Sequence, residues 1–227
     1  MRHATGPGTK GVPRLERERR ILAAATLRFG TDGYRRTSLE AVAAETDISK
    51  ALILSLFGSK DALHLRCVQE AGEVLVAAIT EVLTASPAEY MASDTLRCIF
   101  ESLRHRRYDW ELLHDTTVLE TTEGGRAAIT YRAAIRSLAM DGTYALLGPR
   151  GPVDPVDREI LADVWLGILS ALVSWYQRHI DEVSIAEMLQ RCTTVAQTVG
   201  NVADIAGRST GRDAVRDGAL DVARQGR

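Results

Sequence analysis

Apolar residues recur every three or four positions along most of the chain, which is the spacing that places them on one face of an α-helix. The first such run contains Leu15, Leu22 and Phe29, and it should end near Gly30–Gly33, where glycines interrupt the helix. No stretch of any length shows the apolar–polar alternation of a half-buried β-strand. The pattern therefore predicts an all-α protein.

Three short helices are predicted between residues 15 and 57. Thr37-Ser38-Leu39-Glu40 has the T-x-x-E sequence of a capping box and should open the second helix, which reaches about Thr46. Ser49 is the expected N-cap of a third helix that ends near Phe57. Turns of three or four residues separate the three, and two short helices joined in this way are typical of a helix-turn-helix.

From Ser59 onwards the predicted helices are longer. Ser59 should cap the first of them, and Asp154-Pro155 should open another with proline in its first turn. Ser184-Ile185-Ala186-Glu187 is a capping box that should begin the last helix. The longer helices are expected over residues 59–84, from 87 onward, and over 109–119, 125–147, 156–181 and 185–202.

The composition is that of an ordinary soluble globular protein, with 45% hydrophobic and 26% charged residues. No apolar run approaches the ~20 residues of a membrane-spanning helix and no hydrophobic signal segment opens the chain, so we expect a cytoplasmic protein without a membrane partner. Cys67, Cys98 and Cys192 are scattered, and the five histidines show no metal-ligand spacing. The sequence predicts no metal site and no cofactor.

The net charge of −2 hides an uneven distribution. Residues 1–66 carry 12 Lys and Arg against 7 Asp and Glu, a net charge of +5, and the remaining residues carry −7. A basic first third beside an acidic remainder favours two separate tasks, with the basic part facing an anionic partner. The predicted organisation is a disordered basic arm over 1–14, a helix-turn-helix domain over 15–62, a larger helical domain over 63–206 and a flexible tail over 207–227.

The residues of the short helices make the interpretation more specific. The informative positions within residues 16–66 are Phe29-Gly30, Gly33-Tyr34, Thr37-Ser38, Val42-Ala43, Ile48-Ser49-Lys50, Phe57, Ser59-Lys60-Asp61 and Leu63. With these residues, the stretch resembles the DNA-binding domain of TetR-family transcriptional regulators. The resemblance implies that the third helix enters the major groove of DNA, and that the longer C-terminal half binds a small-molecule effector and forms a homodimer.

Two positions depart from the family pattern. Asp47 stands in the turn where the family usually has glycine, and aspartate is among the few other residues that tolerate a left-handed conformation. Leu54 stands where the family has a tyrosine that contacts a DNA phosphate. Leu54 fits a groove contact and a position at the edge of the core about equally. Lys50 and Lys60, at the two ends of this helix, fit phosphate contacts or ordinary solvated side chains.

The helical period gives the third helix two sides. Ile53, Leu56 and Phe57 should point into the core, with Leu52 at the margin. The other side is poor in hydrogen-bond donors, although apolar side chains can contact thymine methyl groups and serine can bond to either base edge. The residues expected to contact DNA are Thr37, Ser38, Ser49, Lys50, Ala51, Leu54, Ser55 and Lys60.

The C-terminal half contains polar aromatic residues that, at helical spacing, are more often core than ligand site. The resemblance implies an effector pocket among the middle helices, and we expect Trp110, His114, Tyr131 and Trp165 to line it. The helix over 156–181 is apolar around more than half of its circumference, so it should be buried on two sides. The resemblance implies that the last two long helices of each chain form the interface of the homodimer, as a four-helix bundle.

These observations predict a ligand-responsive transcriptional regulator in the cytoplasm, bound to the nucleoid: a homodimeric repressor that a small molecule releases from a palindromic operator in double-stranded DNA. Two other classes remain open. An all-α ligand-binding protein of the same fold, with weak or lost DNA binding, would also suit the apolar third helix. A helical enzyme would need convergent catalytic groups, and the sequence contains no nucleophile elbow, phosphate-binding loop or dinucleotide motif, so no catalytic residue is predicted.

Overall fold

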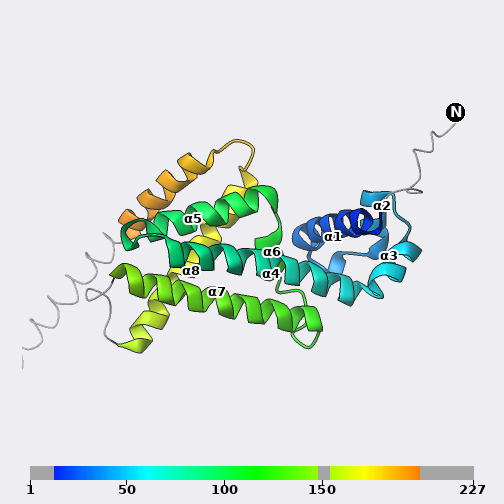
Figure 1. The fold of residues 1–227 in the computed structure, drawn as a ribbon, viewed down its shortest axis with the longest axis horizontal. Helices are drawn as coiled ribbons and strands as arrows, with labels where there is room; N and C mark the ends of the chain where they lie inside the picture. The colour runs from blue at the N-terminus through cyan, green and yellow to red at the C-terminus, as the bar shows by residue number, and fades with distance from the viewer. Residues whose placement is uncertain (1–12, 148–153, 200–227) are drawn as a thin grey trace, which may run out of the picture. The chain divides into compact units, whose positions relative to one another are not determined.

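The computed structural model describes residues 13–147 and 154–199, and every regular element within these ranges is a helix (Figure 1). The all-α prediction is confirmed. Most of the predicted arm over 1–14, the tail over 207–227 and the end of the last predicted helix lie outside the described residues. The helices are α1 (Arg14–Arg36), α2 (Leu39–Thr46), α3 (Lys50–Phe57), α4 (Lys60–Ala85), α5 (Ala88–His105), α6 (Asp109–Leu113), α7 (Glu123–Leu147), α8 (Pro155–Arg178) and a further helix over 185–199.

The chain divides into two compact units, residues 1–180 and 181–227. The domain boundary predicted near residue 62 falls inside the first unit, close to the start of α4. In the second unit, the predicted capping box is present. The Ser184 Oγ accepts a hydrogen bond from the Glu187 N–H at 3.2 Å, and the Glu187 carboxylate accepts one from the Ser184 N–H at 2.8 Å.

Polar side chains begin α3, α4 and α8 at the predicted positions. The Ser49 Oγ accepts a hydrogen bond from a backbone N–H in the first turn of α3 at 3.3 Å, and the Ser59 Oγ does so for α4 at 3.0 Å. The Asp154 carboxylate accepts from an N–H of α8 at 2.8 Å, with proline at the next position. These caps satisfy amides that have no partner inside the helix, so they fix where each helix starts.

The cap of α2 differs from the predicted capping box by one residue. Ser38 occupies the N-cap, and its Oγ accepts a hydrogen bond from the Ala41 N–H at 3.1 Å. Thr37 is buried, and its hydroxyl lies 2.9 Å from the carbonyl oxygens of both Arg28 and Gly33. The predicted box was wrong because the threonine hydroxyl serves the end of α1 and not the start of α2.

The turn between α2 and α3 has the backbone shape that the sequence predicts. Asp47 adopts φ 54° and ψ 25°, which is the left-handed conformation, and no other non-glycine residue among those described has a positive φ. Ile48, directly after it, is 2% exposed and fixes the turn to the core. α2 and α3 therefore form a helix-turn-helix.

α1 is interrupted at Gly33, where φ is 78° and ψ is 160°. Other residues rarely adopt this conformation, and a Cβ at Gly33 would lie 3.0 Å from the Thr117 Oγ1. The following N–H, of Tyr34, donates to the Asp115 carboxylate at 2.6 Å. The predicted break near Gly30–Gly33 is thus confirmed, and it fixes the end of α1 to a turn at residues 115–117.

The same turn explains why α6 is shorter than predicted. The sequence suggests a helix over 109–119, but α6 ends at Leu113 and turns follow. The Asp115 Oδ1 accepts from the Thr117 N–H at 2.7 Å, and its Oδ2 accepts from the Tyr34 N–H. An aspartate side chain that bonds to backbone amides in this way competes with helix formation.

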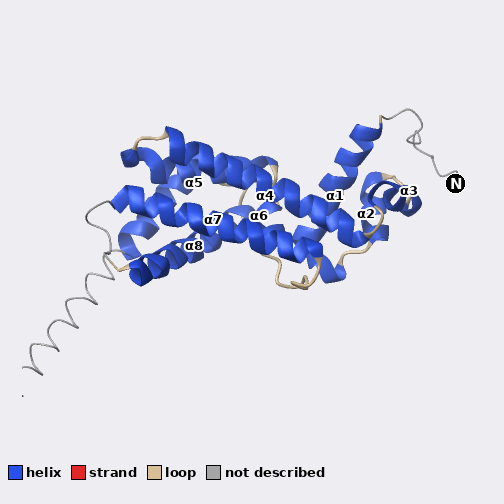
Figure 2. Ribbon diagram, turned by 60° about the horizontal axis from the view of Figure 1, so that its bottom comes forward, coloured by secondary structure: helices blue, strands red, loops and turns tan. Residues whose placement is uncertain are grey.

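α4 is the central helix of the first unit and contacts α1, α3, α5, α6 and α7 (Figures 1 and 2). Its approach to α7 is close at Gly72, where a Cβ would lie 2.1 Å from the ring of Tyr131. α8 packs against α7, and the Arg136 guanidinium bonds to both carboxylate oxygens of Asp163, at 2.6 and 3.1 Å. The N-terminal helices and the longer helices are therefore connected by one continuous helix.

α8 has the length and composition of a membrane-spanning helix, although no segment of this kind is predicted from the sequence. Core helices of soluble proteins also pass this test, but only 17% of the most apolar stretch of α8 is buried. Val156, Ile160, Val164 and Trp165 are between 38% and 61% exposed. The helix thus has an apolar side that the described residues leave uncovered.

Candidate DNA-binding interface

α3 buries one side and exposes the other. Ile53 is fully buried, as predicted, whereas Leu52, Leu56 and Phe57 are half-buried. The structure therefore confirms that Ile53 points into the core. The residues beside it on the buried side of the helix remain partly exposed. The exposed residues are Lys50, Ala51, Leu54 and Ser55, which are the residues expected to face DNA.

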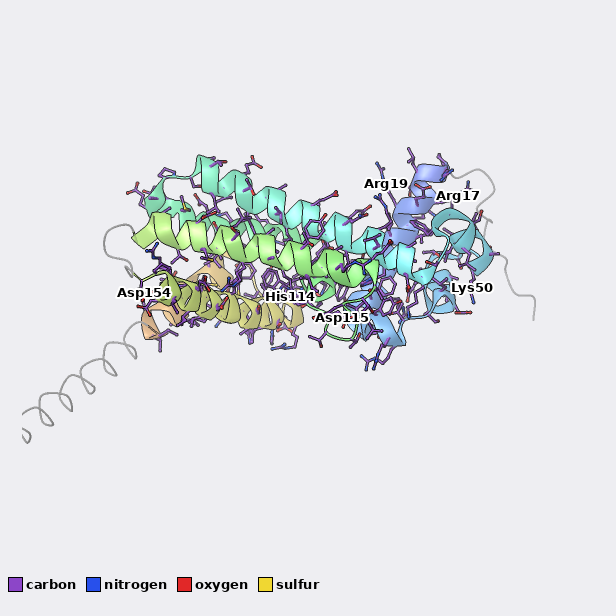
Figure 3. All side chains as sticks on the ribbon, turned by 90° about the horizontal axis from the view of Figure 1, so that it is seen from below. Arg17, Arg19, Lys50, His114, Asp115 and Asp154 are labelled. Atoms are coloured by element: carbon purple, nitrogen blue, oxygen red, sulfur yellow. The ribbon has the colours of Figure 1, made fainter. Side chains whose placement is uncertain are left out.

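Lys50 is the one cation of α3, and it is engaged within the chain. Its Nζ lies 2.5 Å from an oxygen of Glu40 in the first turn of α2, and both side chains are exposed. The hydrogen bond from Lys50 holds the pKa of the Glu40 carboxyl below its usual range. Figure 3 shows Lys50 in the α1–α3 region, which also carries Arg17 and Arg19 on α1. Glu40 therefore offsets the charge of Lys50 on the surface expected to meet phosphates.

Ser38 and Ser49 are exposed at the N-termini of α2 and α3. The helix dipole makes each of these ends favourable for an anion. Thr37, in contrast, is 3% exposed, and its hydroxyl is bonded to backbone carbonyls. The structure therefore does not place Thr37 at the surface predicted to bind phosphate.

Lys60 begins α4 and is half-buried. Its Nζ lies 4.3 Å from the centre of the Tyr34 ring, and the Tyr34 hydroxyl donates a hydrogen bond to the neighbouring Asp61. Burial lowers the pKa of the Lys60 ammonium, while burial and the bond to Asp61 raise the pKa of Tyr34 to about 12. Lys60 thus fixes the end of α1 to α4, in addition to any contact with DNA.

His64, one turn further along α4, lies at the junction of three helices. Its ring centre is 4.9 Å from those of both Phe29 and Tyr34, and a Cβ at Gly124 of α7 would lie 2.3 Å from its Nδ1. The side chain is 1% exposed, and burial lowers the pKa of His64 to about 4. A neutral imidazole therefore connects α1, α4 and α7.

Residues 21–67, from the first third of α1 to the start of α4, match the family model described as bacterial regulatory proteins, tetR family. The uncharacterized HTH-type transcriptional regulator YhgD of Bacillus subtilis (strain 168) is 25% identical over 196 residues, which cover 78% of this chain and 94% of that protein.

Solved structures share the fold. A TetR-like transcriptional regulator from Rhodococcus sp. RHA1 is similar with a TM-score of 0.63 and 22% identity, over 79% of this chain and 92% of that one. A TetR-family transcriptional regulator from Bordetella parapertussis 12822 has a TM-score of 0.67 and 18% identity, over 77% and 90% of the two chains. Residues 21–67 are a TetR-family DNA-binding domain. Its α2 and α3 are therefore the helix-turn-helix that binds DNA.

Four residues are expected to line an effector pocket, and two of them, Trp110 and His114, lie together. Trp110 is buried on α6 and stacks on His114 with ring centres 4.4 Å apart. Tyr131 lies on α7 against Gly72 of α4. Trp165 is 38% exposed on the uncovered side of α8. The structure therefore pairs Trp110 with His114, and it places Trp165 at the surface.

Tyr176 and His64 were not predicted to line a site, although each has a buried polar atom. Tyr176 of α8 is fully buried against Phe100, with ring centres 5.1 Å apart. Among the described residues, its hydroxyl has no hydrogen-bond partner, and neither has the Nε2 of His64. Buried polar atoms are normally paired, so each is a candidate to meet a ligand. An aromatic residue at helical spacing resembles core, and no sequence signal distinguishes these two.

A polar cluster joins α6 to the C-terminal end of α8. The Gln177 Nε2 donates to the Glu111 carboxylate and to the Arg107 carbonyl, each at 2.5 Å. Burial raises the pKa of Glu111 to about 7. Within the described ranges, no group of three or more His, Cys, Asp and Glu side chains is arranged to hold a metal ion. The cluster therefore serves to connect two helices.

Proposed function

We propose that this TetR-family regulator is a homodimeric repressor, which binds a palindromic operator and leaves it when a small molecule binds the helices after α3. The observation that carries the dimer is the uncovered apolar side of α8, with Ile160 56% and Val164 46% exposed. Large exposed apolar surfaces on soluble proteins mark interfaces, and a second copy would bury this one.

The proposed operator contacts come from both ends and the exposed side of the helix-turn-helix. Phosphates would be bound by the N-termini of α2 and α3 and by lysine side chains, and base edges by the exposed side of α3. Thr37 is left out because it is buried. The proposed DNA-binding residues are Ser38, Ser49, Lys50, Ala51, Leu54, Ser55 and Lys60.

We propose that the effector is bound among the helices of the first unit near the Tyr176 hydroxyl, with Trp110, His114 and Tyr131 as further candidates. Support comes from the buried hydroxyl that lacks a partner among the described residues. α4 would transmit the response, because it contacts α1 and α3 as well as α5, α6 and α7. Effector and operator would then weaken each other's binding by the same factor.

The first experiment selects genomic fragments that bind the purified full-length protein, and then measures operator affinity against salt. A repressor of this kind should enrich palindromic fragments, and the logarithm of its affinity should fall linearly with the logarithm of the salt concentration. Candidate small molecules should then release the fragment. Failure to enrich any palindrome would contradict the repressor hypothesis.

A second function has one specific observation in its favour. Lys50 is paired with Glu40 and the rest of the exposed side of α3 is almost apolar, so DNA binding by this chain could be weak and its ligand-binding role dominant. The same salt series separates the two. A ligand-binding protein without an operator would bind all duplexes equally weakly, while still responding to a small molecule in a thermal-shift measurement.

A further inference from the structure

The exposed side of α3 offers base edges few hydrogen-bonding groups. The helix Lys50–Phe57 contains two polar residues, Lys50 and Ser55. The ammonium group of Lys50 lies 2.5 Å from the Glu40 carboxylate. The hydroxyl of Ser49, just before the helix, accepts a backbone N–H as the N-cap. Ser55 is therefore the polar side chain of α3 that neither pairs with a carboxylate nor caps the helix.

This side of α3 offers methyl groups instead. Leu54 is 36% exposed, and Ala51, three positions earlier on the same side, is exposed as well. Ile53 is fully buried, which fixes the rotation of the helix and keeps Ala51 and Leu54 pointing outwards. Aliphatic side chains gain nothing from phosphates, so contact with the backbone of DNA does not account for them.

The major groove has one apolar feature, the C5 methyl group of thymine. Guanine and adenine are usually recognised by two hydrogen bonds from Arg, Lys, Asn or Gln, and the free side of α3 offers no such pair. We infer that Ala51 and Leu54 recognise 5-methylpyrimidines in each half of the operator by burying their C5 methyl groups. This inference rests on the operator binding proposed above and names the chemical feature that the binding reads. Thymine and 5-methylcytosine share that feature.

Removing one methyl group should lower operator affinity moderately, and removing a symmetric pair should lower it strongly. Burying one methyl group changes affinity by about fourfold, from the usual free energy of transfer of a CH₂ group. A palindromic operator presents each position twice to a dimer, so removing one symmetric pair should change affinity by about 15-fold. Both factors are well within reach of an equilibrium titration.

The test uses the full-length protein and the operator obtained by fragment selection. Each thymine of the half-site is replaced by deoxyuridine, singly and in symmetric pairs. Deoxyuridine lacks the methyl group and keeps every hydrogen bond of the base pair. Fluorescence anisotropy should show a loss of about fourfold per thymine at one or two positions of each half-site, and no loss at thymines outside the half-sites.

Two variants assign the effect to a side chain. Leu54→Ala should lower affinity for the unmodified operator and abolish the deoxyuridine penalty at one position, because the methyl group then has no partner to bury it. Lys50→Ala is the matched control on the same helix, and it should weaken binding to thymine and deoxyuridine duplexes by one common factor. Circular dichroism and thermal unfolding verify that both variants fold.

A further pair of duplexes distinguishes the two sources of the methyl group. At a sensitive position, the T·A pair is replaced by C·G and by 5-methylcytosine·G. The methylated duplex should bind more tightly than the unmethylated one. Tighter binding than the thymine duplex would identify methylated cytosine as the source, and weaker binding would identify thymine.

The inference is overturned if the protein binds its operator tightly and every deoxyuridine duplex binds equally well. In that case, operator binding stands and only its proposed chemistry is lost. If no fragment is enriched and binding shows no sequence preference, the proposed operator binding fails, and this inference fails with it. The two failures are therefore distinguishable.

Discussion

At the scale of single residues, the charge and burial of a few side chains determine how the helix-turn-helix region binds DNA and how stable it is. Glu40 lies 2.5 Å from Lys50, on the surface proposed to face phosphates. A carboxylate there reduces the positive field of the helix-turn-helix. His64, in contrast, is a buried neutral imidazole whose protonation must oppose folding.

Replacing Glu40 with glutamine should strengthen DNA binding, because Lys50 then carries an unpaired charge. We expect the affinity for operator and unrelated duplexes to rise together, and the plot of log affinity against log salt to steepen by about 1. Anisotropy titrations at several salt concentrations measure both. Glu45→Gln is the control on the same helix, since Glu45 is paired with Arg28 of α1. Weaker binding of Glu40→Gln would show that the carboxylate itself contacts DNA.

The pKa of His64 predicts how stability depends on pH. The pKa is about 4 in the folded chain and about 6.5 in an unfolded one, so between these values only the unfolded state binds the proton. The free energy of unfolding should therefore fall by about 3 kcal/mol as the pH decreases from 6.5 to 4. Urea unfolding over this range should show a flatter profile for His64→Gln. An unchanged slope in the variant would contradict the assignment.

At the scale of elements, backbone conformation at a turn controls the helix-turn-helix. Among the described residues, Asp47 is the non-glycine residue that has a positive φ, of 54°. Ala should be less stable than Gly at this position by about 1 kcal/mol, because only glycine adopts the left-handed conformation freely. Chemical unfolding of Asp47→Gly and Asp47→Ala measures the difference. The same pair of substitutions at Glu45, inside α2, should have the opposite order, because alanine is the better helix former.

At the scale of the whole molecule, the apolar residues that α8 exposes call for a covering partner. Its exposed apolar residues suit a second copy of the chain, and TetR-family regulators bind DNA as dimers. A membrane is a poorer match, since Asp157, Glu159 and Asp163 lie on the same helix. Burying such carboxylates in lipid is costly.

Ile160→Glu should disrupt the proposed dimer by placing a charge in its apolar interface. We expect light scattering after size exclusion to change from dimer to monomer at micromolar concentration, and operator affinity to fall by at least tenfold because two half-sites are no longer held together. Leu119→Glu, at a residue 57% exposed outside α8, is the control and should remain a dimer. A dimeric Ile160→Glu would place the interface elsewhere.

The sequence by itself determined the features that depend on neighbouring residues. The caps at Ser49, Ser59, Asp154 and Ser184 were predicted because each satisfies backbone amides within the next turn. The left-handed turn at Asp47 and the break near Gly33 follow from the same local chemistry. Helical spacing also identified Ile53 as core.

Only the tertiary structure decided the features that depend on residues far apart in the chain. α6 ends early because Asp115 bonds to the backbone of Tyr34, 81 positions away. Thr37 is buried because its hydroxyl reaches α1, and Lys50 is neutralised because α2 brings Glu40 within 2.5 Å. Periodicity assigns a side chain to one face of its helix. The packing of other helices decides which residues lie against that face. These contacts give His64, Tyr176 and Trp165 their different surroundings.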